Sequence, residues 1–281
     1  DRTPRAARRE ETRRELPAAH VKKSSPVVPT EDETKAPTPV NAGQIPAGKP
    51  LVGAPAFLGR APRATLFEVV SVAVLVIAFY HPLLRFGSMS SGGDAANLFW
   101  PIKLLLQDSL FSQGVVPLWN HWSYMGAPLV GSLQHAIFYP IDILLYGFLS
   151  AHVAINALNL IHLSMAGIGT WACLRGPLNV GAIPAIFCGA AYPCVAWFWG
   201  HQEHLNQIAS ASWLPWVMLF ALRFAFAQCS ARAFLLGTSA VGALQFLTGH
   251  PQCGFYAALA GAAVVLGSCV GGPLRKVWPT A

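Results

Sequence analysis

The sequence predicts an all-α membrane protein, a polytopic bundle of about six transmembrane helices with a long outer loop. Composition is the first observation, because 54% of the residues are hydrophobic and only 11% are charged, whereas soluble proteins carry about 25% charged residues. The second is that several segments approach the roughly 20 apolar residues that a helix needs to cross a bilayer. These observations exclude an ordinary soluble domain and make the lipid bilayer the first predicted partner.

Residues 1–62 are predicted to form a disordered cytoplasmic tail. They begin with the mixed charges of "DRTPRAARREETRREL", and the stretch 22–50 is rich in Pro, Ser, Thr and Gly without any aromatic residue. Such a segment cannot bury enough apolar surface to offset the entropy of ordering it. A basic arm could touch anionic lipid or nucleic acid, but the interspersed acidic residues favour a solvated linker.

The transmembrane domain is predicted to cover residues 63–281. Its expected spans are 64–84, 153–174, 182–199, 209–226, 233–249 and 254–270. The outer loop, residues 86–137, separates the first two spans and is expected to contain amphipathic interfacial helices. The stretch "FYPIDILLYGFLS" is expected to be a short interfacial or re-entrant piece, because an added span there would place the later basic groups on the opposite side from the first.

Basic residues predict the orientation, because Lys and Arg in short loops stay on the cytoplasmic side. Groups of them precede span one, follow span two, separate spans four and five, and follow span six. If the spans alternate, all of these groups lie on one side: Arg60, Arg63, Arg175, Arg223, Arg232, Arg275 and Lys276. The N-terminus is therefore predicted to be cytoplasmic.

The opposite, outer face collects the other polar groups near the membrane from three separate loops. They are Asp94, Asn120, Gln134 and His135 in the long loop, His201, Glu203 and His204 in the second, and His250 and Gln252 in the third. Polar groups that converge on one leaflet predict a single functional site there. These residues are the candidate site residues of the sequence.

Asp94 has two compatible interpretations. It precedes an amphipathic run, with an apolar stripe at Leu98, Ile102, Leu105 and Leu106, so it could simply cap an interfacial helix. Alternatively, its carboxylate could act as a general base or hold a divalent metal ion at the boundary of water and lipid. The preceding Gly92 and Gly93 would let the backbone approach a ligand closely.

The other candidates also carry two interpretations each. His201 and His204, with Glu203 between them, could bind a metal ion together with Asp94, or contact substrate or phosphate, or be polar only because the loop is wet. Trp119 could stack on a ring of the substrate or belong to an aromatic belt. Asp108 and Asp142 are expected to be interfacial charges and His162 a helix contact. No nucleotide-binding or nucleic-acid motif is present in the sequence.

Three blocks of the sequence resemble the YfhO family of bacterial membrane proteins. They are "GGDAANLFWPIKLLLQDSLFSQGVVPLWNHWSYMGAPLVGSLQHAIFYP", "GHQEHLNQIASASWLPW" and "FLTGHPQCGFY". The family shows an Asp soon after the first span, then Phe/Tyr-Pro, Pro-Leu-Trp-Asn, Gly-x-Pro-Leu and Phe-Tyr-Pro. The chain departs from this pattern at Trp100-Pro101, and the resemblance covers about Ser71 to Leu266.

The resemblance implies a fold and a function. The family is similar to the GT-C glycosyltransferases, which carry an acidic residue in the first outer loop, here Asp94. The resemblance thus implies that Asp94 is the catalytic residue, and that Trp119 and the other polar residues of the outer face bind substrate. It therefore implies the N-terminal part of a GT-C-like enzyme in the bacterial cytoplasmic (inner) membrane. The donor would be a polyprenyl-phosphate sugar, and the acceptor an envelope glycan or protein, with the site on the outer face. A transporter or flippase of lipid-linked sugars, or a non-catalytic subunit, is the alternative.

Overall fold

The computed structural model describes residues 62–85, 92–123 and 125–271, all within the unit Pro50–Ala281. The predicted tail, apart from Pro62, lies outside the described residues. The all-α class is confirmed, because the regular secondary structure of this part of the chain is helical except for one short β-hairpin. The long helices of the bundle are α1 (Pro62–Phe79), α4 (Ala151–Arg175), α5 (Ala182–Ala191), α8 (Leu214–Ala225), α9 (Ala231–Leu247) and α10 (Pro251–Gly271).

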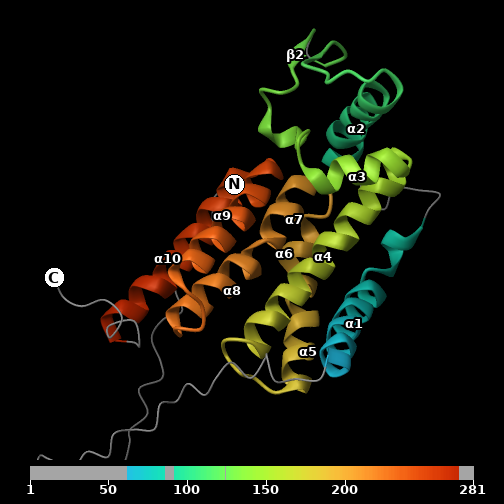
Figure 1. Cartoon of the computed structure of the whole chain (residues 1–281). Helices are drawn as coiled ribbons and strands as arrows, with labels where there is room; N and C mark the ends of the chain where they lie inside the picture. The colour runs from blue at the N-terminus through green and yellow to red at the C-terminus, as the bar shows by residue number, and fades with distance from the viewer. Residues whose placement is uncertain (1–61, 86–91, 124, 272–281) are drawn as a thin grey trace, which may run out of the picture. The chain divides into compact units, whose positions relative to one another are not determined.

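Helix α4 is the centre of the bundle. It packs against α1, α5, α8 and the short helix α7 (Leu205–Ser212) (Figure 1). Small residues allow this close packing: Gly167 of α4 and Gly189 of α5 face each other so closely that a Cβ on either would meet the carbonyl oxygen of the other. Glycines at helix crossings are typical of membrane proteins, where close backbone approach gives the helices their packing energy.

Four described segments are long and apolar enough to cross a membrane: Ala151–Arg175, Ala182–Gly200, Leu205–Ala225 and Pro251–Val270. The second and third contain breaks. The second passes from α5 through η5 (Tyr192–Cys194) into α6 (Ala196–Gly200), and the third joins α7 to α8. The predicted first and fifth spans correspond to α1 and α9, which have 18 and 17 residues and are not among these four. The count of six spans therefore remains a prediction.

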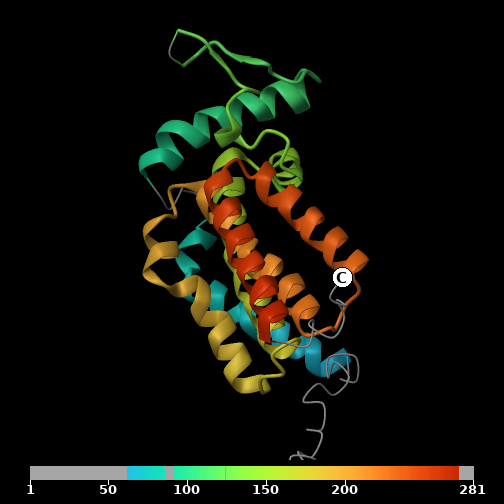
Figure 2. The same cartoon turned by 90° about the vertical axis from the view of Figure 1, so that its left-hand side faces the viewer.

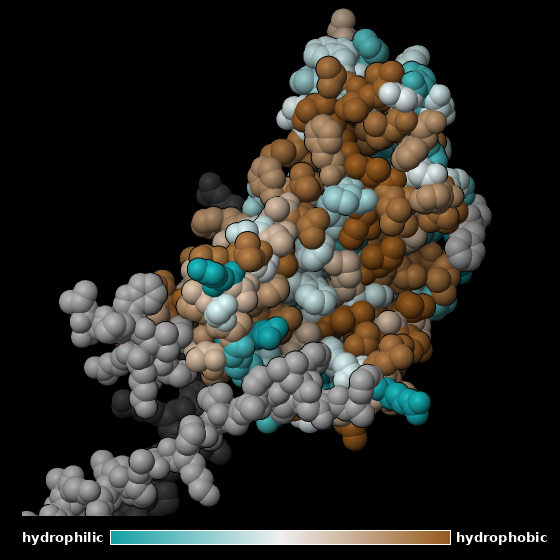
Figure 3. All heavy atoms as spheres, viewed as in Figure 1, coloured by the Kyte–Doolittle hydropathy of each residue, from teal (hydrophilic) through white to brown (hydrophobic). Residues whose placement is uncertain are grey.

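The outside of the bundle is apolar. Large side chains such as Phe67, Val74, Phe187, Leu259 and Leu266 are exposed on α1, α5 and α10. Figure 3 shows apolar residues covering much of one face of the molecule. Because soluble proteins rarely expose such extended apolar surfaces, this exterior supports a lipid environment.

The predicted outer loop forms a small layer at one end of the bundle, which we call the α2 end (Figure 2). Segments η2 (Ala95–Phe99), α2 (Trp100–Gln107) and η3 (Asp108–Ser112) follow one another as helix, and the hairpin pairs β1 (Trp119–Asn120) with β2 (Ala127–Pro128). Of the predicted stripe, Ile102 and Leu106 are buried, while Leu98 and Leu105 pack against them. Segments η4 (Leu133–His135) and α3 (Pro140–Phe148) complete the layer, and the nine residues of α3 are too few to span a bilayer.

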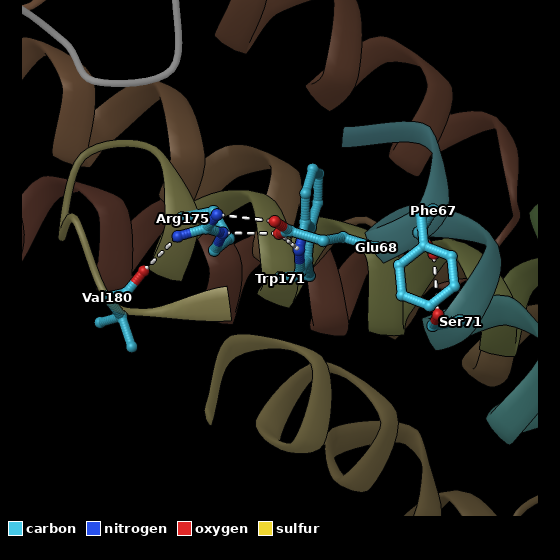
Figure 4. A network of polar contacts seen from close by, with 6 residues as sticks. All are labelled: Phe67, Glu68, Ser71, Trp171, Arg175 and Val180. Atoms are coloured by element: carbon cyan, nitrogen blue, oxygen red, sulfur yellow. Dashed lines mark hydrogen bonds and ion pairs between the residues drawn. The ribbon is translucent and has the colours of Figure 1, made fainter. Parts of the chain in front are cut away.

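A buried ion pair fastens α1 to α4 at the other end of the bundle. Arg175 donates from Nε and Nη2 to the two carboxylate oxygens of Glu68, both at 2.6 Å, and from Nη1 to the carbonyl of Val180 at 2.8 Å (Figure 4). The Trp171 indole also donates to Glu68, at 2.9 Å. The start of α1 and the end of α4 therefore lie at the same end of the bundle. Arg175 is buried rather than exposed in a loop.

Candidate functional site

Asp94 lies at the start of the helical segment that leads into α2, but its side chain makes no capping hydrogen bond to the backbone. Its own backbone is already helical, with φ −63° and ψ −32°, whereas a residue that caps a helix usually has an extended backbone. The capping interpretation of Asp94 is thus not the arrangement that the structure shows. Its half-exposed carboxylate is directed to another loop.

His204 meets Asp94 from the loop between α6 and α7. The imidazole Nδ1 lies 3.0 Å from Asp94 Oδ2, and Nε2 lies 3.6 Å from Glu203 Oε1. The exposed fraction is 27% for the His204 side chain and 54% for Asp94. One imidazole therefore stands between two carboxylates, and Asp94 keeps an open side toward solvent. This contact joins the first and second predicted loops, which are far apart in the sequence.

Gly93 makes room for the second carboxylate. Its φ is +54°, and a Cβ at this position would run into the Glu203 side chain. The sequence predicts that Gly93 allows close approach of a ligand; in the structure it allows close approach of Glu203. Gly92, by contrast, has open space around its Cβ position.

His201 extends the cluster away from Asp94. Its Nδ1 donates to the carbonyl of Trp197 at 2.7 Å, and its ring stacks on the Trp197 ring with a centroid distance of 4.5 Å. With the Nδ1 proton engaged, the Nε2 of the neutral ring is an acceptor. The rings of His201 and His204 have centroids 5.7 Å apart. His201 thus lies between the Asp94 cluster and a cavity.

This cavity, which we call the α6–α10 cavity, has a volume of about 440 Å³. It brings together His201 and Gln207 from one side with His250 and Gln252 from the other. The remaining lining residues are Tyr192, Trp197, Phe198, Ala211, Leu214, Cys253 and Tyr256. The second and third predicted loops therefore meet at this cavity, which is of the size typical of ligand sites, about 300–1,000 Å³.

His250 is held through its backbone, and its side chain is partly buried. Its carbonyl accepts a hydrogen bond from Ser210 Oγ at 3.1 Å. Burial lowers the pKa of the His250 imidazole below its usual value, and the nearby charge of His204 lowers it further. The neutral form is therefore favoured at this position, in which one ring nitrogen donates and the other accepts.

The predicted residues of the first loop beyond Asp94 have structural roles. Asn120 is buried and holds the hairpin turn, since its Oδ1 accepts from the Trp122 amide at 3.0 Å and its Nδ2 donates to Ser123 at 3.0 Å. Trp119 is half exposed and lies against Gly126. Among the described residues, neither Asn120 nor Trp119 forms a hydrogen bond with the Asp94 cluster.

His135 and Gln134 lie closer to the base of the layer. His135 is buried, and its Nδ1 lies 3.3 Å from the carbonyl of Leu129. Burial lowers the pKa of this imidazole. Gln134 is exposed and lines a small cavity beside Asp142. Both residues lie beside the buried ion pair that is described next.

Lys103 and Asp142 form a buried ion pair that the sequence analysis does not predict. Lys103 Nζ also donates to the His135 carbonyl at 2.8 Å and lies 5.3 Å from the centre of the Tyr146 ring. The sequence predicts Asp142 to be an interfacial charge, but its residue exposure is only 4%. Asp108 agrees with that expectation, because it is exposed and accepts from Gln113 at 2.7 Å.

His162 is fully buried in α4 and engaged on both ring nitrogens. Nδ1 donates to the Leu158 carbonyl at 2.7 Å, and Nε2 accepts from the Tyr139 hydroxyl at 2.6 Å. The Trp213 indole in turn donates to Tyr139, at 3.1 Å. This closed network has the geometry of a packed contact between helices, in agreement with the expectation for His162.

Within the described part of the chain, no group of three or more His, Cys, Asp or Glu is placed to hold a metal ion. Of the predicted metal ligands, Asp94 and Glu203 each contact His204. Comparison of the chain with known protein families, curated proteins and solved structures finds no match.

Proposed function

We propose that this protein is a glycosyltransferase of the GT-C type, related to the YfhO family. It transfers a sugar from a polyprenyl-phosphate carrier to an envelope glycan or protein on the outer face of the bacterial cytoplasmic membrane. The observation that carries this proposal is the contact of Asp94 with His204 beside a ligand-sized cavity. A second contact, between Glu203 and His204, holds the imidazole from its other side.

Asp94 is the proposed general base. The Asp94 carboxylate accepts the proton of a hydroxyl group on the acceptor. The oxygen of that hydroxyl forms a bond with the anomeric carbon of the sugar, while the bond from the anomeric carbon to the carrier phosphate breaks. His204 fixes the carboxylate through the Nδ1 contact and balances its charge when protonated. A base must lie within hydrogen-bond reach of its proton. The half-exposed Asp94 carboxylate is open to solvent, and His204 and His201 link it to the cavity.

Arg85 is the proposed partner of the carrier phosphate. It is exposed directly after η1 (His81–Leu84), and its carbonyl accepts from Asn156, near the start of α4, at 3.2 Å. This places a cation at the α2 end of the bundle, beside the apolar exterior. A guanidinium matches phosphate geometry well because it can donate two parallel hydrogen bonds.

A transfer assay on membrane vesicles tests the role of Asp94. Asp94→Asn should lower the rate of sugar transfer from the polyprenyl-phosphate donor by about 100-fold or more, because an amide cannot accept the proton. The matched control is Asp108→Asn, which removes an exposed carboxylate from the same helical segment. Full transfer by Asp94→Asn, or an equal loss in both variants, would contradict the proposal.

The alternative of an ion-coupled transporter receives less support. A proton relay within the membrane needs a side chain that can gain and release protons. The candidate in the bundle, His162, has both ring nitrogens engaged in the Leu158 and Tyr139 contacts. The exposed carboxylate and the cavity both lie at the α2 end.

A further inference from the structure

The α6–α10 cavity has a chemically distinctive lining. Aromatic rings of Tyr192, Trp197 and Phe198 come from η5 and α6, and Tyr256 comes from α10. The polar groups are the amides of Gln207 and Gln252 and the imidazoles of His201 and His250. Among the residues that the structure describes, no Lys, Arg, Asp or Glu lines it.

These polar groups suit a ligand whose groups both donate and accept hydrogen bonds. An amide side chain carries a donor and an acceptor, and a neutral imidazole carries one of each. A sugar hydroxyl also donates and accepts, and the C–H face of a pyranose packs well on an aromatic ring. The cavity thus offers matching partners to both the polar edge and the apolar face of a sugar.

The surroundings oppose an anion in the same place. The carboxylates of Asp94 and Glu203 lie on one side of the cavity, because both contact His204, whose ring centre is 5.7 Å from that of His201. Phosphate sites in proteins are built from Arg, Lys or clustered backbone N–H groups. Two neighbouring carboxylates would repel a phosphate, whereas they leave an uncharged ring unaffected.

We propose that the α6–α10 cavity binds the uncharged pyranose ring of a glycoside, while any carrier phosphate stays outside it. The inference rests on the proposed function, since the ring would then lie next to the base: His201 lines the cavity and neighbours His204, which holds Asp94. Gln207 and Gln252 bind the ring hydroxyls from opposite sides, and the aromatic rings hold its C–H face. The inference names the substrate class of the site and assigns Gln207 as a specificity residue.

The pH dependence of binding separates the two ligand classes. The titratable groups around His250 are His201, His204, Cys253, Tyr192 and Tyr256. Because burial already lowers the pKa of His250, covering it with a neutral ring opposes protonation further. Glycoside affinity should then stay constant above the pKa values of the histidines and fall as they protonate. An anion in the cavity would show the reverse, because protonated imidazoles attract it.

Binding of methyl glycosides to the protein in lipid nanodiscs, followed by saturation-transfer NMR, tests the inference. At least one neutral methyl hexoside should bind, and Gln252→Leu and Gln207→Leu should each weaken it about fivefold to tenfold through loss of a hydrogen bond. Gln113→Leu is the matched control, because Gln113 is an exposed amide of the outer loop that contacts Asp108. Asp94→Asn should keep glycoside binding while transfer is lost.

Three outcomes would overturn the inference. They are the absence of binding by every neutral hexoside, affinity that neither Gln variant lowers, and inorganic phosphate that competes with the glycoside and binds more tightly as the pH falls. Failure of the proposed function looks different. In that case Asp94→Asn would keep the transfer rate or no transfer would occur, while glycoside binding still responded to the Gln variants.

Discussion

At the scale of single residues, one backbone conformation decides how two loops meet. Gly93 has a φ of +54°, in the left-handed region that favours glycine, and the Glu203 carboxylate occupies the space of its missing Cβ. The next residue, Asp94, contacts His204 of the same loop. Asp94 can therefore reach His204 because Gly93 has no side chain to displace Glu203.

Gly93→Ala should accordingly destabilise the protein and disturb the Asp94–His204 contact. The left-handed backbone alone costs a residue with a Cβ about 1–2 kcal/mol, and the displacement of Glu203 adds to this. The free energy of unfolding in detergent, together with the transfer rate, measures both effects. Gly92→Ala is the control, because nothing lies near its Cβ position. In a Glu203→Ala background, the destabilisation by Gly93→Ala should fall to the backbone contribution alone. The same destabilisation in both backgrounds would contradict the steric explanation.

At the scale of elements, the segment that carries Asp94 is held by a buried charge. Lys103 lies in α2 with 1% exposure and pairs with Asp142 of α3. Asp142 Oδ1 and the Tyr146 hydroxyl are buried without a hydrogen-bond partner in the described part of the chain. The Asp142 carboxylate therefore lacks one of its hydrogen bonds. Removal of Lys103 would leave it as an unpaired buried charge, which is strongly destabilising.

Lys103→Met should lower the free energy of unfolding by about 3–5 kcal/mol, because it leaves a buried carboxylate unpaired. The double variant Lys103→Met with Asp142→Leu should recover most of the loss, since it replaces the pair by apolar groups. Chemical unfolding of both variants in detergent micelles measures the difference. Equal destabilisation of the single and double variants would show that the ion pair itself is not what holds α2 to α3.

The sequence predicts elements better than it predicts contacts between them. The apolar spacing of Leu98, Ile102 and Leu106 predicts a helix with one apolar face, because helix periodicity is a local property. The structure has a helix there, with Ile102 and Leu106 buried. Lys103 falls on the buried side of that helix, between Phe99 and Leu106 at helical spacing. This position on the apolar face is a sequence signal that Lys103 is buried. Its partner Asp142 could not be identified, because pairing arises only when α2 and α3 fold together.

The candidate site shows the same division. Alternating spans predict that the loops of Asp94, His204 and His250 share one end of the bundle, and the structure brings the first two within hydrogen-bond distance. The buried role of Asn120 was not predicted, because a turn-forming amide and a ligand-binding amide look alike in a sequence. The aromatic and amide lining of the α6–α10 cavity was also missed, because its residues come from helices that meet only in the fold.

At the scale of the whole bundle, the two ends differ in chemistry. The α2 end carries the Asp94 cluster and the cavity, and the other end carries the Glu68–Arg175 pair that ties α1 to α4 (Figure 4). Arg223 and Arg232 lie on either side of the turn from α8 to α9. If basic residues remain cytoplasmic, the α2 end faces the outside, and α1 and α9 must cross the membrane together with the four longer segments.

Cysteine labelling of intact cells tests this topology in a cysteine-free version of the protein. Trp122→Cys and Gln252→Cys should react with an impermeant reagent from outside, because Trp122 is 86% exposed at the hairpin and Gln252 is exposed at the start of α10. Arg63→Cys and Arg232→Cys, at the starts of α1 and α9, should react only after permeabilisation. If Arg63→Cys and Trp122→Cys are both labelled from outside, α1 does not span the membrane. If Arg232→Cys and Gln252→Cys are both labelled from outside, α9 does not span the membrane. A fully reversed pattern would place the Asp94 cluster in the cytoplasm, where an outer-face donor could not reach it.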